Sequence, residues 1–292
     1  MTRHRKIIDA SLRRHLSAVY RTERLAGAVG QLARAALRYA LRQLPDQLTA
    51  FNVRHVADLI RGIVARLRHV AGYLIAVRLK GLAEWGHLAM ARVLTTGAKR
   101  ELAKTEESVV TEDLLDYLKM IIRPPSQWFL KQVVGRAPDL LTRLIDPQAA
   151  SDIVLQGVAE GFDRTKIAKN LTQVFGGFET SARRVARTEG LRVATQTQLS
   201  ASEEIPELIR GYQILSVLDA RVRPDHRARH GTIYHREPKG DQLGFDVMPQ
   251  PPIDQPGNVL AWNCRCFLAP VFSMEEANSD DVRGMLADGI IQ

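Results

Sequence analysis

Apolar residues recur at three- and four-residue steps over most of the first hundred positions. The first such face consists of Leu12, Leu16, Val19, Tyr20, Leu25, Val29, Leu32, Ala36, Leu37 and Leu41. This spacing predicts a long amphipathic helix, which Pro45 ends because proline cannot continue it. The second face consists of Val53, Val56, Leu59, Ile60, Ile63, Val64, Leu67 and Val70. It predicts a second helix that continues toward residue 104, with Gly81 and Gly86 as the candidate break points.

The middle of the chain predicts shorter helices. Three are expected between residues 111 and 160, the last of them starting near Pro147, since proline suits the first turn of a helix. Residues 163–175 read as a capped helix that Gly176 and Gly177 stop. A further helix is expected from about residue 179 to residue 203.

The period of the pattern changes from 3.6 to 2 after Pro206. Tyr212, Ile214, Ser216 and Leu218 alternate with Gln213, Leu215 and Val217, which predicts a short strand. A brief strand is expected at residues 232–235 and a returning strand at 259–271, with a Pro- and Gly-rich loop between them. Ser273 would cap a last helix. The pattern predicts a mainly α protein with a small α+β C-terminal module, in which long N-terminal helices precede a loop-rich, few-stranded sheet packed on helices.

This pattern divides the chain into four expected segments. Residues 1–110 form a basic long-helix region and residues 111–177 are connecting short helices. Residues 178–273 form the α+β module, and residues 274–292 are a C-terminal helix or tail. The 292 residues are enough for two domains, or for one domain with a long helical extension.

Positive charge is concentrated in the first of these segments. The whole chain carries +9, yet residues 1–104 hold 20 Lys and Arg against 6 Asp and Glu. Such an asymmetry favours a polyanionic partner, although Arg residues can also simply solvate the outer face of a helix. No base-reading motif accompanies the charge, so we expect DNA contact to be non-specific. The candidate contacts are Arg13, Arg14, Arg34, Arg38, Arg61, Arg66 and Arg68.

Several classes of protein are disfavoured. The basic N-terminus has no apolar core followed by a cleavage site, which predicts no secretory signal. No uncharged apolar run approaches 20 residues, so no membrane partner is expected. The chain has no phosphate-binding G-x-x-x-x-G-K-[ST] loop, no G-x-G-x-x-G after a strand and no G-x-S-x-G elbow. These patterns favour a binding or structural protein over an enzyme.

Three polar motifs stand in the C-terminal third, namely R-T-E-G at 187–190, D-A-R-V-R-P-D-H at 219–226 with a glycine at 231, and N-C-R-C at 263–266. Guanidinium groups match carboxylates bidentately, so the motifs predict a polar cluster that holds a loop-rich module together. We expect that cluster to contain Arg187, Glu189, Asp219, Arg221, Arg223, His226, Asn263, Cys264, Arg265 and Cys266.

The alternative interpretation of these motifs is a zinc site. His226, Cys264 and Cys266 are the candidate ligands, because zinc takes imidazole and thiolate ligands tetrahedrally. Along a regular strand the two cysteine side chains would lie about 6.5–7 Å apart, so both could bind one ion only where the strand bends. A zinc-containing hydrolase or nuclease-like enzyme using Asp219, His226, Cys264 and Cys266 is the alternative function. The favoured expectation is no cofactor.

The order and spacing of the three motifs resemble the Mu-F-like phage head morphogenesis family, also called minor capsid proteins, over roughly residues 180–270. Val222 stands where that family usually has Thr, and the residues before Asp219 lack its aromatic residue. The resemblance implies a structural minor head protein of a tailed bacteriophage that acts in head morphogenesis. It also implies binding to the portal protein, contact with other capsid or scaffolding proteins, and a place in the capsid interior close to packaged DNA, after assembly in the host cytoplasm.

Overall fold

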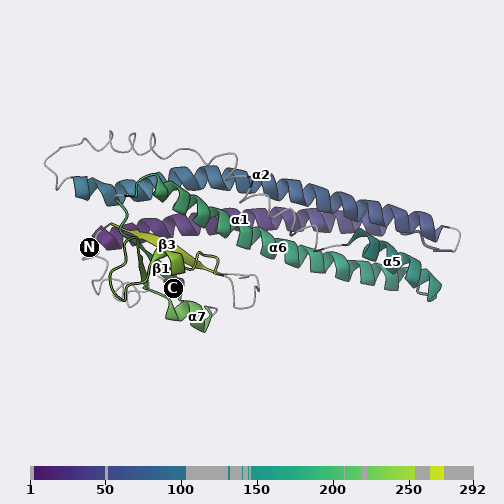
Figure 1. The fold of residues 1–292 in the computed structure, drawn as a ribbon. Helices are drawn as coiled ribbons and strands as arrows, with labels where there is room; N and C mark the ends of the chain where they lie inside the picture. The colour runs from purple at the N-terminus through teal and green to yellow at the C-terminus, as the bar shows by residue number, and fades with distance from the viewer. Residues whose placement is uncertain are drawn as a thin grey trace. The chain divides into compact units, whose positions relative to one another are not determined.

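The structure, a computed structural model, describes residues 3–49, 52–102, 131, 140, 144, 146–206, 208–218, 222–253 and 264–272. Its elements are α1 (Arg3–Arg42), α2 (Val53–Leu102), α5 (Pro147–Ala159), α6 (Arg164–Glu203), β1 (Gly211–Ser216), α7 (Pro224–Ala228), β2 (Ile233–His235), the 3-10 helix η1 (Phe245–Val247) and β3 (Cys266–Val271), labelled in part in Figure 1. The predicted class is confirmed, since long N-terminal helices precede a three-stranded antiparallel sheet. The short helices expected before residue 146, the first part of the returning strand and the last helix lie outside the described residues.

The two long N-terminal helices begin and end close to where the pattern predicts. The first ends at Arg42, just before Pro45, and the second runs through both Gly81 and Gly86 without a break. Their buried faces differ in part from the predicted ones, because Leu16 and Tyr20 are exposed while His15 and Ala18 are buried. Apolar side chains therefore remain on the outer face of α1.

The predicted helix stop at Gly176 and Gly177 is wrong, because α6 continues through both glycines. The two glycines are exposed, and the residues on either side of them, Phe175 and Phe178, are each 1% exposed. Burying a phenylalanine side chain contributes about 1.5–3 kcal/mol, whereas a glycine inside a helix costs about 0.5–1 kcal/mol relative to alanine. The free energy gained by burying the two phenylalanines on one face of α6 therefore outweighs the cost of the two glycines on its exposed face.

The sheet has the order β2-β1-β3, with both neighbours antiparallel to β1. The predicted strand is confirmed at Gly211–Ser216, and every residue of β1 is buried. Tyr212 and Ile214 pack in one apolar cluster, while Leu215 packs in another with Ile8 and Leu12 of α1. The central strand is thus covered on both faces, so its period-2 pattern does not separate core from solvent.

The described chain divides into two compact units. The first comprises residues 1–20, 81–130 and 190–292, and the second comprises residues 21–80 and 131–189. Each unit takes residues from the basic N-terminal helices as well as from later parts of the chain.

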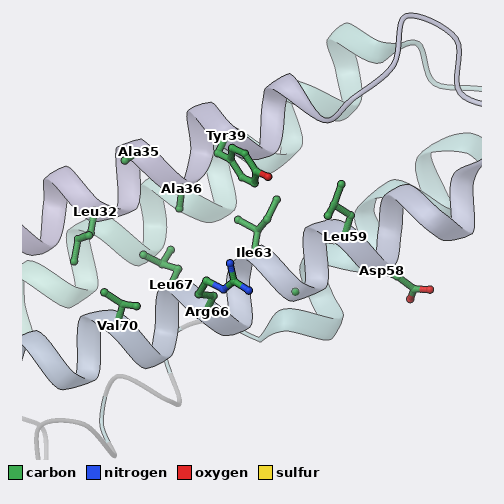
Figure 2. A pocket seen from close by; sticks show the side chains of 11 residues that line it. Leu32, Ala35, Ala36, Tyr39, Asp58, Leu59, Ile63, Arg66, Leu67 and Val70 are labelled. Carbon is green, nitrogen blue, oxygen red and sulfur yellow. The ribbon is translucent and has the colours of Figure 1, made fainter.

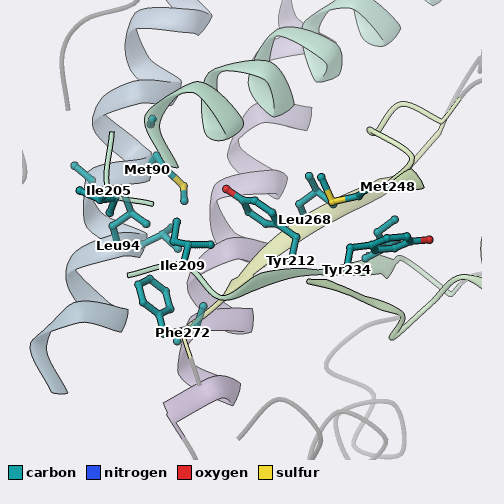
Figure 3. Close-up of a cluster of buried hydrophobic side chains, with 14 residues drawn as sticks. Met90, Leu94, Ile205, Ile209, Tyr212, Tyr234, Met248, Leu268 and Phe272 are labelled. Carbon is teal, nitrogen blue, oxygen red and sulfur yellow. The ribbon is translucent and has the colours of Figure 1, made fainter. Parts of the chain in front are cut away.

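The main core of the first unit joins the sheet to helical side chains (Figure 3). Met90 and Leu94 of α2 belong to this cluster together with Tyr212 of β1 and Leu268 of β3. Tyr212 is completely buried, and burial raises the pKa of its hydroxyl. The C-terminal module therefore shares its core with residues of the first hundred positions.

A buried polar chain connects α1, α6 and β3 within the same unit. The Arg14 guanidinium donates to the Gln198 side-chain oxygen at 2.8 Å and to the Ala194 carbonyl at 2.6 Å. The Gln198 amide nitrogen donates in turn to the Leu268 carbonyl of β3 at 3.0 Å. Burial lowers the pKa of Arg14 to about 10, so the guanidinium stays charged at neutral pH.

An aromatic contact lies beside this chain, where the His15 ring stacks on Phe267 with 4.9 Å between ring centroids. Burial, together with the charges of Arg14 and Arg265, lowers the pKa of His15 to about 3. The ring is therefore neutral at physiological pH and packs as an apolar group. Within the described part of the chain, no helix combines the length and apolarity needed to cross a bilayer.

Alanine at Gly177 should stabilise the protein. A Cβ atom there meets no neighbour within 4 Å, so Gly177→Ala should raise the free energy of unfolding by about 0.5–1 kcal/mol through helix propensity alone. The matched change in α5 is Gly157→Ala, whose Cβ would lie 2.7 Å from Ile167 Cγ1 and should destabilise by about 1–3 kcal/mol. Chemical denaturation of the full chain measures both. A destabilising Gly177→Ala would contradict the continuous helix.

Removing the Gln198 amide should destabilise the protein by about 2–4 kcal/mol, because Gln198→Ala strips a partner from a buried charge and leaves the Leu268 carbonyl without its donor. The matched control is Gln196→Ala, since Gln196 is half-exposed and bonds the Gln250 side chain. That change should cost no more than about 0.5 kcal/mol. Equal losses of unfolding free energy in the two variants would show that the buried polar chain does not stabilise the protein.

Candidate functional site

The second polar motif forms the short helix α7, which places His226 beside the start of β3. Pro224 stands in the first turn of α7, and Asp225 adds a negative charge there. Gly231 then turns the chain with a φ of 85°, a conformation that favours glycine, and its amide donates to the Ile214 carbonyl at 2.8 Å. Ile214 in turn donates to the Thr232 carbonyl at 2.9 Å. These bonds fix the motif against β1.

His226, Cys264 and Cys266 form a compact cluster, which we call the Cys-His cluster. The His226 Nδ1 atom lies 3.3 Å from the Cys266 sulfur and 3.6 Å from the Cys264 sulfur. All three potential ligand atoms lie within 4.8 Å of one another, and all three residues are buried. Cys264 precedes β3 and is not part of a regular strand, so both sulfurs can face the same point. The bend that two-cysteine binding requires is therefore present.

The two thiols are reduced and share their hydrogen bonding. The Cys266 thiol donates to Cys264, and His226 also stabilises the negative form, so the pKa of Cys264 falls to about 4 although burial opposes this. The pKa of Cys266 is raised by its bond to the Cys264 sulfur and by burial. The pair therefore loses one proton readily and holds the other. A thiolate at this position can bind a metal ion or attack an electrophile.

Other polar groups surround the Cys-His cluster. The Ile253 amide donates to the Cys264 sulfur at 3.4 Å, and the Ser216 hydroxyl lies 3.4 Å from the Cys266 sulfur. On the other side of the ring, His226 Nε2 lies 3.4 Å from an Arg223 nitrogen and 3.6 Å from an Asp225 oxygen. Each ring nitrogen of His226 thus faces groups that can fix its tautomer.

The structure brings together four members of the predicted polar cluster, namely Arg223, His226, Cys264 and Cys266. Arg265 stands between the two cysteines, and its charge acts on the buried His15. Asp219, Arg221 and Asn263 lie outside the described residues. Arg187, Thr188 and Glu189 of the first motif belong to the second compact unit, where Glu189 is fully buried. There Arg187 donates to Glu23 at 2.8 Å, a partner that the motifs did not predict.

The candidate DNA contacts are not equally accessible. Arg14 is 8% exposed and committed to the buried polar chain, so it presents no charge to a polyanion. Three of the other six form ion pairs, namely Arg13 with Asp9, Arg34 with Glu179, and Arg61 with Asp58. The remaining three make no ion pair among the described residues. They are the exposed Arg38 and Arg66 and the half-buried Arg68.

Sequence reasoning missed the groups that position the site. Ser216 is the β1 residue opposite Cys266 in the strand register, and Ile253 comes from the Pro-rich loop. Neither belongs to a motif. The role of Gln198 could not be predicted from the sequence either, because an isolated glutamine on a helix is common. Gln198 matters because it lies one turn beyond Ala194, on the helix face that contacts Arg14.

The fold and the site together define a helix-rich protein with a small antiparallel sheet. Each of its three polar motifs contributes a buried polar residue, namely Glu189, His226 and the pair Cys264 and Cys266. A family model described as Phage Mu protein F like protein matches residues 148–269, a range that contains all three motifs. The resemblance predicted from the motifs is thereby confirmed for that part of the chain. No curated protein and no solved structure matches the chain.

The matched family indicates the class of function. It is a family of phage structural and morphogenesis proteins, which points to a phage head morphogenesis protein located in the virion capsid and interacting with other capsid components. The same assignment favours a non-enzymatic role.

Proposed function

We propose that this protein is a minor head protein of a tailed phage that binds the portal on the capsid interior and contacts packaged DNA without sequence preference. The observation that carries the proposal is the family match over residues 148–269, with the three motifs in order inside it. The portal and DNA contacts go beyond that match and rest on the surfaces of the two long N-terminal helices.

The two long helices carry most of the exposed large hydrophobic residues of the described chain. Of the nine large hydrophobic residues exposed in the described part of the chain, seven lie on α1 or α2. In the second unit, α1 and α2 also border a cavity of about 490 Å³ (Figure 2). Its lining is mostly apolar, with Leu32, Tyr39, Ile63, Leu67 and Val70 among the residues, and it also contains Asp58 and Arg66. Exposed apolar patches of this kind mark protein-binding surfaces. We assign this groove to the portal.

A serine at Tyr39 should weaken portal binding. Tyr39 is 53% exposed at the groove, and truncating an aromatic anchor typically costs an interface about 2 kcal/mol, which is more than tenfold in affinity. The matched control is Tyr73→Ser, because Tyr73 is 70% exposed on α2 but does not line the groove. Copurification of each full-length variant with the portal measures the effect. Equal retention of the two variants would exclude this groove.

The exposed arginines support weak DNA contact. Arg38 and Arg66 are exposed, and neither has an ion-pair partner among the described residues, so both can reach phosphate when no portal is bound. Arg66 also borders the groove that we assign to the portal. Arginine that neutralises phosphate releases counterions, which makes such binding strongly salt-dependent and blind to sequence.

Reversing these two charges should weaken DNA binding at low salt and reduce the slope of log affinity against log salt by about 2, one for each phosphate that the protein no longer neutralises. The variant is Arg38→Glu with Arg66→Glu in the full chain, measured by fluorescence anisotropy. Arg184→Glu with Lys239→Glu makes the same charge change at two exposed positions outside residues 1–104. If the control lost as much affinity, only net charge would matter. No measurable affinity in the parent protein would remove DNA from the proposal.

The burial of the Cys-His cluster supports a non-catalytic role. His226 is 2% exposed and Cys264 is 4% exposed, so a polymeric substrate has no direct access to them. A hydrolase or nuclease would need that access. Turnover of a phosphodiester or peptide substrate by the purified protein would overturn this part of the proposal.

A further inference from the structure

We infer that the Cys-His cluster is a structural zinc site in which His226 Nδ1 and the sulfurs of Cys264 and Cys266 are three ligands of one Zn²⁺ ion. The inference does not depend on portal or DNA binding. Zinc prefers this donor set, because thiolate and imidazole are its usual ligands in structural sites.

The spacing of the ligand atoms fits a tetrahedral ion. With zinc–nitrogen bonds of about 2.0 Å and zinc–sulfur bonds of about 2.3 Å, the nitrogen–sulfur edge of a tetrahedron is about 3.5 Å. The two edges observed here are 3.3 Å and 3.6 Å. The sulfur–sulfur edge of the same tetrahedron would be about 3.8 Å, and the two sulfurs lie within 4.8 Å of each other. Both nitrogen–sulfur edges thus match a tetrahedral zinc ion, and one corner is left for a fourth ligand.

The surroundings also suit a metal centre. The Ile253 amide and the Ser216 hydroxyl lie 3.4 Å from the two sulfurs, where hydrogen bonds stabilise thiolate ligands. The Asp225 carboxylate lies 3.6 Å from the ring nitrogen of His226 that faces away from the sulfurs. A carboxylate in this position would hold the ring in the tautomer whose other nitrogen binds the ion, once it closes to hydrogen-bond distance in place of Arg223, whose guanidinium lies 3.4 Å from the same nitrogen.

The local core gives the ion a structural task. Among the described residues, the apolar cluster around the two cysteines consists of Ile253, Cys264 and Cys266. A core this small contributes little burial to fix the start of β3 against the loop that carries Ile253 and against α7. One ion bound by all three residues would join these segments, with the cysteines on one side and the histidine on the other.

The test is the metal content of the full-length protein, purified without an affinity tag and under reducing conditions, measured by mass spectrometry of the elements. We expect one zinc per chain. Cys264→Ala, Cys266→Ala and His226→Gln should each lose it. His230→Gln should keep it, because His230 lies outside the Cys-His cluster and its Nδ1 accepts the Ser216 amide at 3.0 Å.

Cobalt exchange into the parent protein keeps the inference testable even if the variants fail to fold. Co²⁺ bound by two thiolates in a tetrahedral site gives sulfur-to-metal charge-transfer bands and intense visible bands, which should disappear when Zn²⁺ is added back. Absence of stoichiometric metal, an octahedral cobalt spectrum, a Cys264–Cys266 disulfide, or zinc retained by Cys266→Ala would each overturn the inference.

Discussion

A guanidinium buried beneath the sheet is the constraint on which the rest of the first compact unit depends. Arg14 is charged and 8% exposed, so its hydrogen bonds must be made inside the protein or its burial becomes very costly. Gln198 accepts one of these bonds and passes its own donor on to the Leu268 carbonyl of β3. Leu268 is two residues from Cys266 in β3. The hydrogen bonds that pair the buried Arg14 guanidinium therefore also hold the strand that begins at Cys266.

This arrangement makes the basic helix part of the module. Ile8 and Leu12 of α1 pack against Phe267 of the sheet. Met90 and Leu94 of α2 belong to the other apolar cluster, which contains Tyr212. The first turns of α1 therefore serve the core, whereas the charges and apolar side chains on its outer face are those that we propose for DNA and portal contact. A change near residue 14 would disturb the sheet, whereas one at an exposed position such as Arg38 leaves the core intact.

Periodicity alone predicted much of this fold. The ends of the long helices, the helix starting at Pro147 and the strands at residues 211–216 and 233–235 follow from local signals. It failed at Gly176, where burial of the flanking phenylalanines decides. At β1 the alternation predicted the strand but not that both of its faces are covered. The motifs led us to expect His226 and the two cysteines in one polar cluster, but a shared metal ion only as the alternative. The detailed geometry could not be predicted, since it depends on the irregular backbone at Cys264 and on the turn at Gly231.

The central claim is that the chain is a component of the phage head. The most direct measurement is quantitative mass spectrometry of purified, DNA-filled heads, with the major capsid protein as the internal standard. The account predicts that this chain is present in every preparation at a small and constant number of copies per head. Complete, DNA-filled heads that lack the chain would contradict it.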